Sequence, residues 1–211
     1  MKKENLEQVN RLVQKLGLLF QKVKEAFSAK VSKSSEILPG MYVYADGSIS
    51  AKRKAKRQVK AVVGYVEGKT VYAVCLKKTG LSWSFHHLKV KASRNMISGK
   101  EATRKILAAA IKQRKNAEAV QWCYAYAEDG VIPGEAFLPS LEELEKLYAN
   151  KEAINRSLSA LNARKLDGQY LSSAEYDMDS ACLLDMDSGD RGCGYKHLFI
   201  YYARPVIAIQ L

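Results

Sequence analysis

The hydrophobic period changes several times along this chain of 211 residues, and these changes restrict the folds it can adopt. Residues 4–28 follow a helical period, residues 41–76 alternate with a period of two, and residues 98–128 and 140–161 return to a helical period. The tail from residue 166 has β and turn character. This order lacks the strand–helix alternation that βαβ units need. The sequence therefore predicts an α+β fold rather than a doubly wound sheet.

The N-terminal segment predicts an amphipathic helix with a coiled-coil seam. Its apolar residues stand alternately three and four positions apart: Leu6, Val9, Val13, Leu16, Phe20, Val23 and Phe27. A seam with this period is typical of a short coiled coil. An isolated helix of this length is marginal in water, so it requires a partner, which is either a second copy of the chain or its own domain. We expect residues 1–30 to form an oligomerisation helix, and residues 31–39 to form a polar linker.

Two β-hairpins are expected in the region of two-residue period. Asp46-Gly47 and Glu67-Gly68-Lys69 supply the turns, because such glycine-containing sequences are typical of hairpin connections. The expected strands are Met41–Ala45 with Ser48–Ala51, Val59–Val66 with Thr70–Leu76, and a separate apolar strand, Val206–Leu211.

Three helical regions are expected after the hairpins. They span residues 98–115, 117–127 and 140–161, with a break at Asn150. Ser140 and Glu143 have the spacing of a capping box, in which each side chain accepts a hydrogen bond from the other residue's backbone N–H.

Charge is distributed unevenly along the chain, whose formal net charge is +12. Residues 1–115 hold 26 Lys and Arg against 7 Asp and Glu, whereas residues 116–211 hold 8 against 15. A protein that coats nucleic acid would be basic throughout. The run Lys52–Lys60 could contact phosphates or an acidic partner, but it lacks the interleaved aromatic residues of a single-strand platform. Its other interpretation is a solvated connection between the two hairpins.

The sequence shows no sign of a membrane span, a secretory signal or a cysteine-based metal site. No apolar stretch in the N-terminal region approaches the ~20 residues of a membrane span, and residues 1–30 lack the apolar core of a secretory signal. The four cysteines show no CxxC spacing. We therefore expect a protein synthesised in the cytoplasm with reduced thiols, no metal and no cofactor.

Four short motifs occur in an order that is familiar from one family. They are Tyr42–Ser48 (YVYADGS), Phe137–Leu144 (FLPSLEEL), Tyr170–Glu175 (YLSSAE) and Tyr202–Val206 (YARPV). Together they resemble the motifs of bacterial C-type-lectin-like domains, a group that overlaps with the variable proteins of diversity-generating retroelements. The resemblance implies a C-type-lectin-like (formylglycine-generating-enzyme-like) domain over residues 40–211. It also implies a non-catalytic, receptor-binding or adhesion function.

In the variable proteins, the C-terminal segment is a hypervariable ligand-binding surface. The resemblance places that surface at about residues 171–201, with Leu171 standing where the motif has Trp. The implied ligand-binding residues are Leu171, Tyr176, Asp177, Asp179, Cys182, Leu184, Asp190, Cys193, Tyr195, His197, Leu198 and Ile200. The implied scaffold residues are Ser172, Ser173, Glu175 and Arg204. The expected partner is a protein or glycan on a target cell, bound by a homo-oligomer, with a trimer as the first expectation and a phage particle as one location.

Other chemistry is weakly supported. Asp185–Asp190 departs from the order of an EF-hand loop, and Lys196 stands where the loop needs its final Glu. His86 and His87 are adjacent, so on a strand they would point to opposite faces. Cys182 and Cys193 lack the surroundings of the cysteine pair in formylglycine-generating enzymes, so we expect no enzyme. Two alternatives remain: a fixed-specificity structural, virion or fibre protein, and a nucleic-acid or acidic-partner module that binds through Lys52–Lys60.

Overall fold

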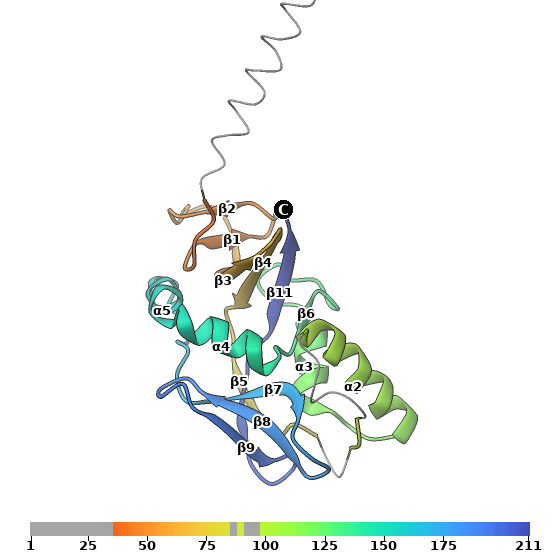
Figure 1. The fold of residues 1–211 in the computed structure, drawn as a ribbon. Coiled ribbons are helices and arrows are strands. Elements are labelled where there is room, and N and C mark those ends of the chain that lie inside the picture. The colour runs from red at the N-terminus through yellow and green to blue at the C-terminus, as the bar shows by residue number, and fades with distance from the viewer. Residues whose placement is uncertain (1–35, 85–87, 91–97) are drawn as a thin grey trace, which may run out of the picture. The chain divides into compact units, whose positions relative to one another are not determined.

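The computed structural model of the chain describes residues 36–84, 88–90 and 98–211. Within these ranges it contains two β-sheets and four helices, α2 to α5, which together make a mixed α+β fold, as predicted (Figure 1). The predicted oligomerisation helix of residues 1–30 and the pair His86-His87 lie outside the described residues. Both assignments stay predictions.

The first sheet, sheet A, contains both predicted hairpins. Its strand order is β2-β1-β3-β4-β11-β6, and every neighbouring pair is antiparallel. Gly47 (φ 82°) and Gly68 (φ 58°) occupy the two hairpin turns, where a left-handed backbone favours glycine. The strands are β1 (Tyr42–Tyr44), β2 (Ile49–Ser50), β3 (Val59–Glu67), β4 (Thr70–Cys75), β6 (Ala136–Phe137) and β11 (Val206–Gln210). The predicted strand at 206–211 is confirmed as β11, which pairs with β4 and β6.

The second sheet, sheet B, comes mostly from the C-terminal tail. Its order is β5-β10-β7-β8-β9, in which β10 and β7 are parallel and the other pairs are antiparallel. The strands are β5 (Thr79–Leu81), β7 (Gln169–Glu175), β8 (Ser180–Asp185), β9 (Arg191–Tyr195) and β10 (Tyr201–Ala203). β9 therefore lies at one edge of the sheet, as Figure 1 shows.

The helices begin and end close to their predicted positions. They are α2 (Gly99–Gln113), α3 (Glu118–Ala125), α4 (Leu141–Ala149) and α5 (Lys151–Ala160). Ser98 caps α2, the predicted capping box of Ser140 and Glu143 is present at α4, and Asn150 separates α4 from α5. All of these are local signals that the sequence carries within one helical turn.

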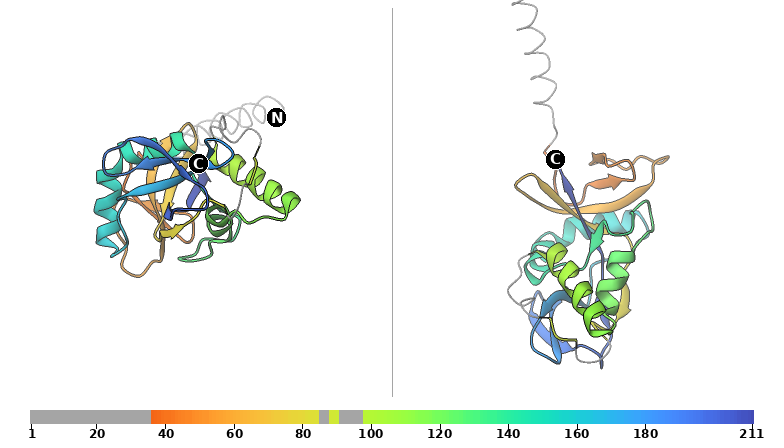
Figure 2. Two further views of the ribbon diagram at one scale, coloured as in Figure 1. Left: turned by 90° about the horizontal axis from the view of Figure 1, so that it is seen from below. Right: turned by 90° about the vertical axis from the view of Figure 1, so that its right-hand side faces the viewer.

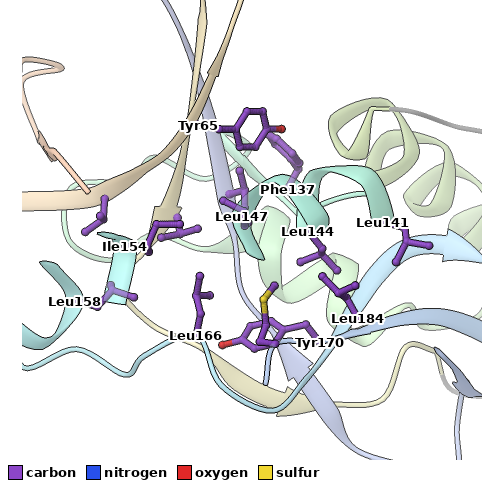
Figure 3. Close-up of a cluster of buried hydrophobic side chains, with 14 of the residues drawn as sticks. Tyr65, Phe137, Leu141, Leu144, Leu147, Ile154, Leu158, Leu166, Tyr170 and Leu184 are labelled. Atoms are coloured by element: carbon purple, nitrogen blue, oxygen red, sulfur yellow. The ribbon is translucent and has the colours of Figure 1, made fainter. Parts of the chain in front are cut away.

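The main hydrophobic core lies where α4 and α5 contact both sheets (Figure 3). Leu144, Leu147, Ile154 and Leu158 from these helices pack with side chains of sheet A and sheet B. The sheet residues of this core include Val62, Val74, Tyr170 and Leu184. A second core joins α2 and α3, which lie side by side (Figure 2), to Leu171 and Leu183 of sheet B. Because neighbouring strand residues alternate in direction, these two cores cover opposite faces of β7 and β8.

Glu143 links the starts of two helices. Its side chain accepts hydrogen bonds from the Ser140 N–H at 2.8 Å and from the Gly99 N–H at 3.2 Å. Only 4% of the residue is exposed. Burial raises the pKa of this carboxyl group to about 7, although both backbone N–H groups and Lys146 oppose the rise.

This raised pKa predicts a pH-dependent stability. Above its ordinary pKa, Glu143 loses its proton in the unfolded chain but keeps it in the folded one, so folding becomes less favourable until the pH passes the folded-state pKa. Replacing Glu143 with Gln keeps a capping side chain but removes the titration. We expect the unfolding free energy of the native chain, relative to that of Glu143→Gln, to fall by about 2 kcal/mol between about pH 5 and about pH 7. Urea denaturation of both proteins across this range measures the difference, and parallel curves would contradict the prediction.

Candidate ligand-binding surface

A groove runs between the start of α4 and the β9 edge of sheet B. It has a volume of about 490 Å³. Its lining residues come from α4, β7, β8, β9 and the turn after β7: Leu141, Glu142, Ala174, Tyr176, Cys182, Arg191, Gly192 and Cys193. We call this cavity the sheet groove. Three of its residues, Tyr176, Cys182 and Cys193, belong to the ligand-binding set predicted from the sequence.

An ion pair ties the edge strand to the helix. The Arg191 Nε donates to Glu145 Oε1 at 2.5 Å, and its Nη2 donates to Glu145 Oε2 at 2.8 Å. This two-point contact fixes the plane of the guanidinium group. The Arg191 side chain is 60% exposed, so the pair adds little stability, but it orients a polar group at the groove.

All the larger side chains of β9 share one face. Arg191, Cys193 and Tyr195 alternate with Gly192 and Gly194 along the strand. A Cβ atom at residue 194 would lie 2.4 Å from the Tyr201 hydroxyl oxygen and 2.6 Å from its ring. The opposite face of β9 therefore needs glycine at residue 194. The larger side chains of the strand lie on the face that carries Cys193.

Exposed apolar side chains continue from the end of β9 toward β10. Tyr195 is 50% exposed, Leu198 62%, Phe199 53% and Ile200 76%. We call these four residues the apolar edge. The Phe199 ring centroid lies 6.3 Å from that of Tyr195 and 6.2 Å from that of Tyr201, so three aromatic rings form a row. Clustered exposed apolar residues of this kind mark interaction sites more often than isolated ones do.

A second hollow adjoins the apolar edge. It has a volume of about 350 Å³ and is lined by Gly80, Gln169, Phe199, Ile200, Tyr201 and Tyr202. A Cβ atom at residue 80 would lie 2.7 Å from a methyl carbon of Ile200. Because residue 80 of β5 is glycine, the Ile200 side chain has room to lie against this strand.

Lys196 anchors the surface from inside the protein. None of its side chain is exposed. Its ammonium group forms an ion pair with Glu175 and donates to the carbonyl oxygens of Leu88 (3.1 Å), Asp177 (2.9 Å) and Met178 (3.0 Å). Burial lowers the pKa of this ammonium group, and the Glu175 carboxylate opposes the shift. The contacts hold the turn after β7 and the segment 88–90 to the base of the apolar edge.

The turn between β7 and β8 is also held by its own side chains. Asp177 Oδ1 accepts from the Asp179 N–H at 2.8 Å and the Ser180 N–H at 2.6 Å. These hydrogen bonds, that of Asp179 first, lower the pKa of Asp177. Tyr176 and Met178, which are 43% and 46% exposed, therefore project from an ordered turn.

The structure brings most of the predicted ligand-binding residues to the surface but corrects two of them. Leu171 and Leu184 are 1% and 0% exposed and belong to the two cores on either side of sheet B. Their side chains are therefore not available to a ligand. The members that are exposed or partly exposed are Tyr176, Asp177, Asp179, Asp190, Cys193, Tyr195, His197, Leu198 and Ile200. Cys182 is 9% exposed and lines the sheet groove.

The four predicted scaffold residues make contacts inside the protein. The Ser172 hydroxyl donates to the Cys182 carbonyl oxygen at 2.8 Å, and the Ser173 N–H donates to the Pro139 carbonyl oxygen at 2.8 Å. Glu175 pairs with Lys196. Arg204 is 2% exposed, and its Nη2 donates to the carbonyl oxygen of Arg164 at 2.5 Å. Sequence reasoning gave no role to Lys196, Arg191 or Phe199.

The acidic turn after β8 is organised by backbone hydrogen bonds. Asp185 Oδ1 accepts from the Asp187 N–H at 2.8 Å, and Asp187 Oδ2 accepts from the Gly168 N–H at 3.0 Å. Among the described residues, no three His, Cys, Asp or Glu side chains come together in a way that could hold a metal ion. In the same residues, no helix has both the length and the apolar character needed to cross a membrane.

Internal contacts engage half of the cations in the run Lys52–Lys60. Arg57 forms an ion pair with Asp46 and lies 4.5 Å from the centroid of the Tyr44 ring. Lys60 is buried and pairs with Glu135 at 2.6 Å, and Arg53 donates to the Ala160 carbonyl oxygen at 2.8 Å. Lys52, Lys54 and Lys56 are exposed, and this part of the run forms a short basic loop.

Comparisons with known proteins give information on the fold. No protein-family model matches the chain, and no curated protein matches it. A solved structure of a fimbrial protein from Bacteroides ovatus ATCC 8483 superimposes with a TM-score of 0.69 over 82% of this chain. The chain shares its fold with part of a fimbrial protein. The two sequences are 15% identical, and the match covers 49% of the fimbrial protein, so this chain spans about half of that structure's length.

Proposed function

We propose that this chain is a non-catalytic ligand-binding protein of the receptor-binding or adhesion type. Its contact surface consists of the sheet groove and the apolar edge, and its ligand is a protein or glycan on a target cell. The observation that carries the proposal is the clustering of half-exposed Tyr195 and Phe199 with Leu198 and Ile200 beside a groove. Aromatic anchors beside polar groups such as Arg191 are the residues that dominate binding energy at interfaces.

The fold similarity to a fimbrial protein is consistent with an adhesion or structural role. We propose further that the scaffold is C-type-lectin-like and that residues 1–30 assemble it into a homo-oligomer, which would strengthen weak individual contacts. The display site would be a cell surface or a phage particle. The alternative is a structural protein of fixed specificity.

Diversification by a retroelement is a separate part of the proposal. The support for it is the sequence motifs together with the exposed turns and edge strand that lie within residues 171–201. If the gene is diversified, substitutions should concentrate at exposed positions such as Tyr176, Tyr195 and Ile200. The buried Leu171 and Leu184 should stay apolar. Deep sequencing of this part of the gene across a population tests the idea, and an invariant segment would favour fixed specificity.

A matched pair of isoleucines tests the contact surface. Ile200 in the apolar edge is 76% exposed, and Ile111 on α2 is 79% exposed. We expect Ile200→Ser to weaken binding of the full chain by about fivefold or more, because loss of one central apolar contact costs at least about 1 kcal/mol. Ile111→Ser should bind like the unchanged protein. The probes are a glycan array and a set of intact bacterial cells.

Two other results of this binding experiment would count against the proposal. Equal binding by both variants would contradict the proposed contact surface. If the unchanged chain bound neither glycans nor cells, the structural alternative would be favoured. Both isoleucines are largely exposed, so neither change should disturb folding.

A further inference from the structure

Two cysteines of sheet B stand directly opposite each other. In the antiparallel pairing of β8 with β9, Cys182 is the register partner of Cys193. Opposed residues of neighbouring strands point to the same face, and both cysteines line the sheet groove. Both are thiols in this structure.

The hydrogen-bond ladder shows which kind of position the pair occupies. The Lys196 N–H donates to the Asp179 carbonyl oxygen at 2.8 Å, and the Asp185 N–H donates to that of Asp190 at 2.9 Å. In this register hydrogen-bonded pairs recur at every second residue, so on the side of β8 they fall at residues 179, 181, 183 and 185. Cys182 lies between them, and its carbonyl oxygen accepts instead from Ser172 of β7. Cys182 and Cys193 therefore form a non-hydrogen-bonded pair.

Such a pair has the spacing that a disulfide needs. Cα atoms in non-hydrogen-bonded antiparallel pairs lie about 4.5 Å apart, with close side chains. Disulfides span Cα separations of about 4.4–6.8 Å. The edge position of β9 also allows small adjustments, since one of its two sides carries no further strand within sheet B. The bond can thus close without rearranging the sheet.

The pair also differs from the two other cysteines in access. Cys193 is exposed and Cys182 is 9% exposed at the groove, whereas Cys75 and Cys123 are 0% exposed. Burial raises the pKa of the Cys75 and Cys123 thiols, which makes their reactive thiolate forms scarce. A small disulfide in solution can therefore reach Cys193 first.

We propose that Cys182 and Cys193 are a redox modification site that closes into a cross-strand disulfide by exchange with a low-molecular-weight disulfide such as oxidised glutathione. The Cys193 thiolate attacks one glutathione sulfur and releases the other glutathione as a thiolate. The Cys182 thiolate then attacks the Cys193 sulfur of the mixed disulfide and releases the second glutathione thiolate. The two protein thiols lose two protons and two electrons, and one oxidised glutathione becomes two reduced molecules.

This inference goes beyond the proposed binding function and departs from the expectation of four reduced thiols. The bond would cross the sheet groove and fasten β9 to β8 beside the apolar edge. The chain would then present the same surface in two covalent states, selected by the redox potential around it.

Thiol mapping of the full chain tests the proposal. The folded protein is equilibrated with defined ratios of oxidised to reduced glutathione, its remaining thiols are alkylated, and the digest is analysed by mass spectrometry. We expect a mass loss of about 2 Da before alkylation and one cross-linked peptide pair that joins residues 182 and 193. The disulfide stabilises the fold by the same free energy by which the fold stabilises the disulfide. The equilibrium constant for oxidation of the two thiols by glutathione should therefore be about 100-fold larger in buffer, where the chain is folded, than in urea.

Variants identify the pair. Cys193→Ser should abolish the mass loss, whereas Cys123→Ser, which keeps both groove thiols, should leave it intact. A cross-link between Cys75 and Cys123 would overturn the proposal. So would persistent glutathione on Cys193 with Cys182 still open to alkylation, or equal equilibrium constants in buffer and urea. None of these measurements depends on ligand binding, so their results are independent of whether the proposed binding function is correct.

Discussion

Replacing Lys196 with Met should lower the free energy of unfolding by about 3–5 kcal/mol, the cost of removing one partner from a buried ion pair. Met has a similar length and fills the space beside the Trp83 ring, 4.9 Å from the Lys196 Nζ. The loss therefore reports charge and hydrogen bonds rather than a cavity. The Glu175 carboxylate would stay in place without its ammonium partner, and three backbone carbonyl groups would each lose a donor.

A double variant separates the electrostatic part of this loss from the rest. Lys196→Met combined with Glu175→Gln removes both charges, so it should recover part of the lost stability relative to Lys196→Met alone. Lys165→Met, at an exposed lysine before β7, should change stability by less than about 0.5 kcal/mol. Urea denaturation of the four proteins gives these differences. A Lys196→Met variant as stable as Lys165→Met would show that the ion pair does not anchor the surface.

The elements that could be predicted from the sequence are those with local signals. Asp46-Gly47 marks one hairpin turn, and Ser140 with Glu143 marks the start of α4, because a few adjacent residues determine a turn or a cap. The position of β11 between β4 and β6 and the parallel pairing of β10 with β7 have no such signal. They depend on contacts between segments that lie far apart in the sequence.

The two incorrect site predictions, for Leu171 and Leu184, have a common physical cause. Their strands, β7 and β8, are covered on both faces, by α4 on one side and by α2 and α3 on the other. A strand buried on both faces shows no alternation of polar and apolar residues, so its apolar side chains cannot be separated from those of an exposed surface. The resemblance places Leu171 and Leu184 in the ligand-binding set, and no alternation along these two strands marks them as buried.

Three residues of the candidate surface were not predicted from the sequence: Lys196, Arg191 and Phe199. Lys196 acquires its role only because the fold brings Glu175, Leu88 and the turn after β7 around its ammonium group. Arg191 could have been found through its spacing of two from Cys193, once a strand was assumed there. Phe199 stands next to Leu198 and Ile200, both of which were predicted. A continuous apolar run at the surface would have included it.

Gly99→Ala is expected to destabilise the fold by about 3 kcal/mol or more, because the added methyl group meets backbone that cannot move independently. A Cβ atom there would lie 2.6 Å from the Leu138 carbonyl oxygen, 2.7 Å from the Ser140 nitrogen and 2.4 Å from Glu143 Oε2. The first two atoms belong to the segment that starts α4, and the third belongs to its capping box. Relief of the clash would push α2 away from α4 and break the hydrogen bond from the Gly99 N–H to Glu143.

Gly192→Ala is the matched control for this substitution. No heavy atom outside residues 191–193 lies within 4 Å of a Cβ built at residue 192, and alanine suits a strand at least as well as glycine does. We expect its unfolding free energy to change by less than about 0.5 kcal/mol. Thermal and urea unfolding of both variants provide the comparison, with circular dichroism to confirm helix content. If Gly99→Ala unfolded at the same urea concentration as Gly192→Ala, the close approach of α2 to the capping box would be wrong. If only Gly99→Ala lost stability, that approach would fix the position of α4, the helix that forms one wall of the sheet groove.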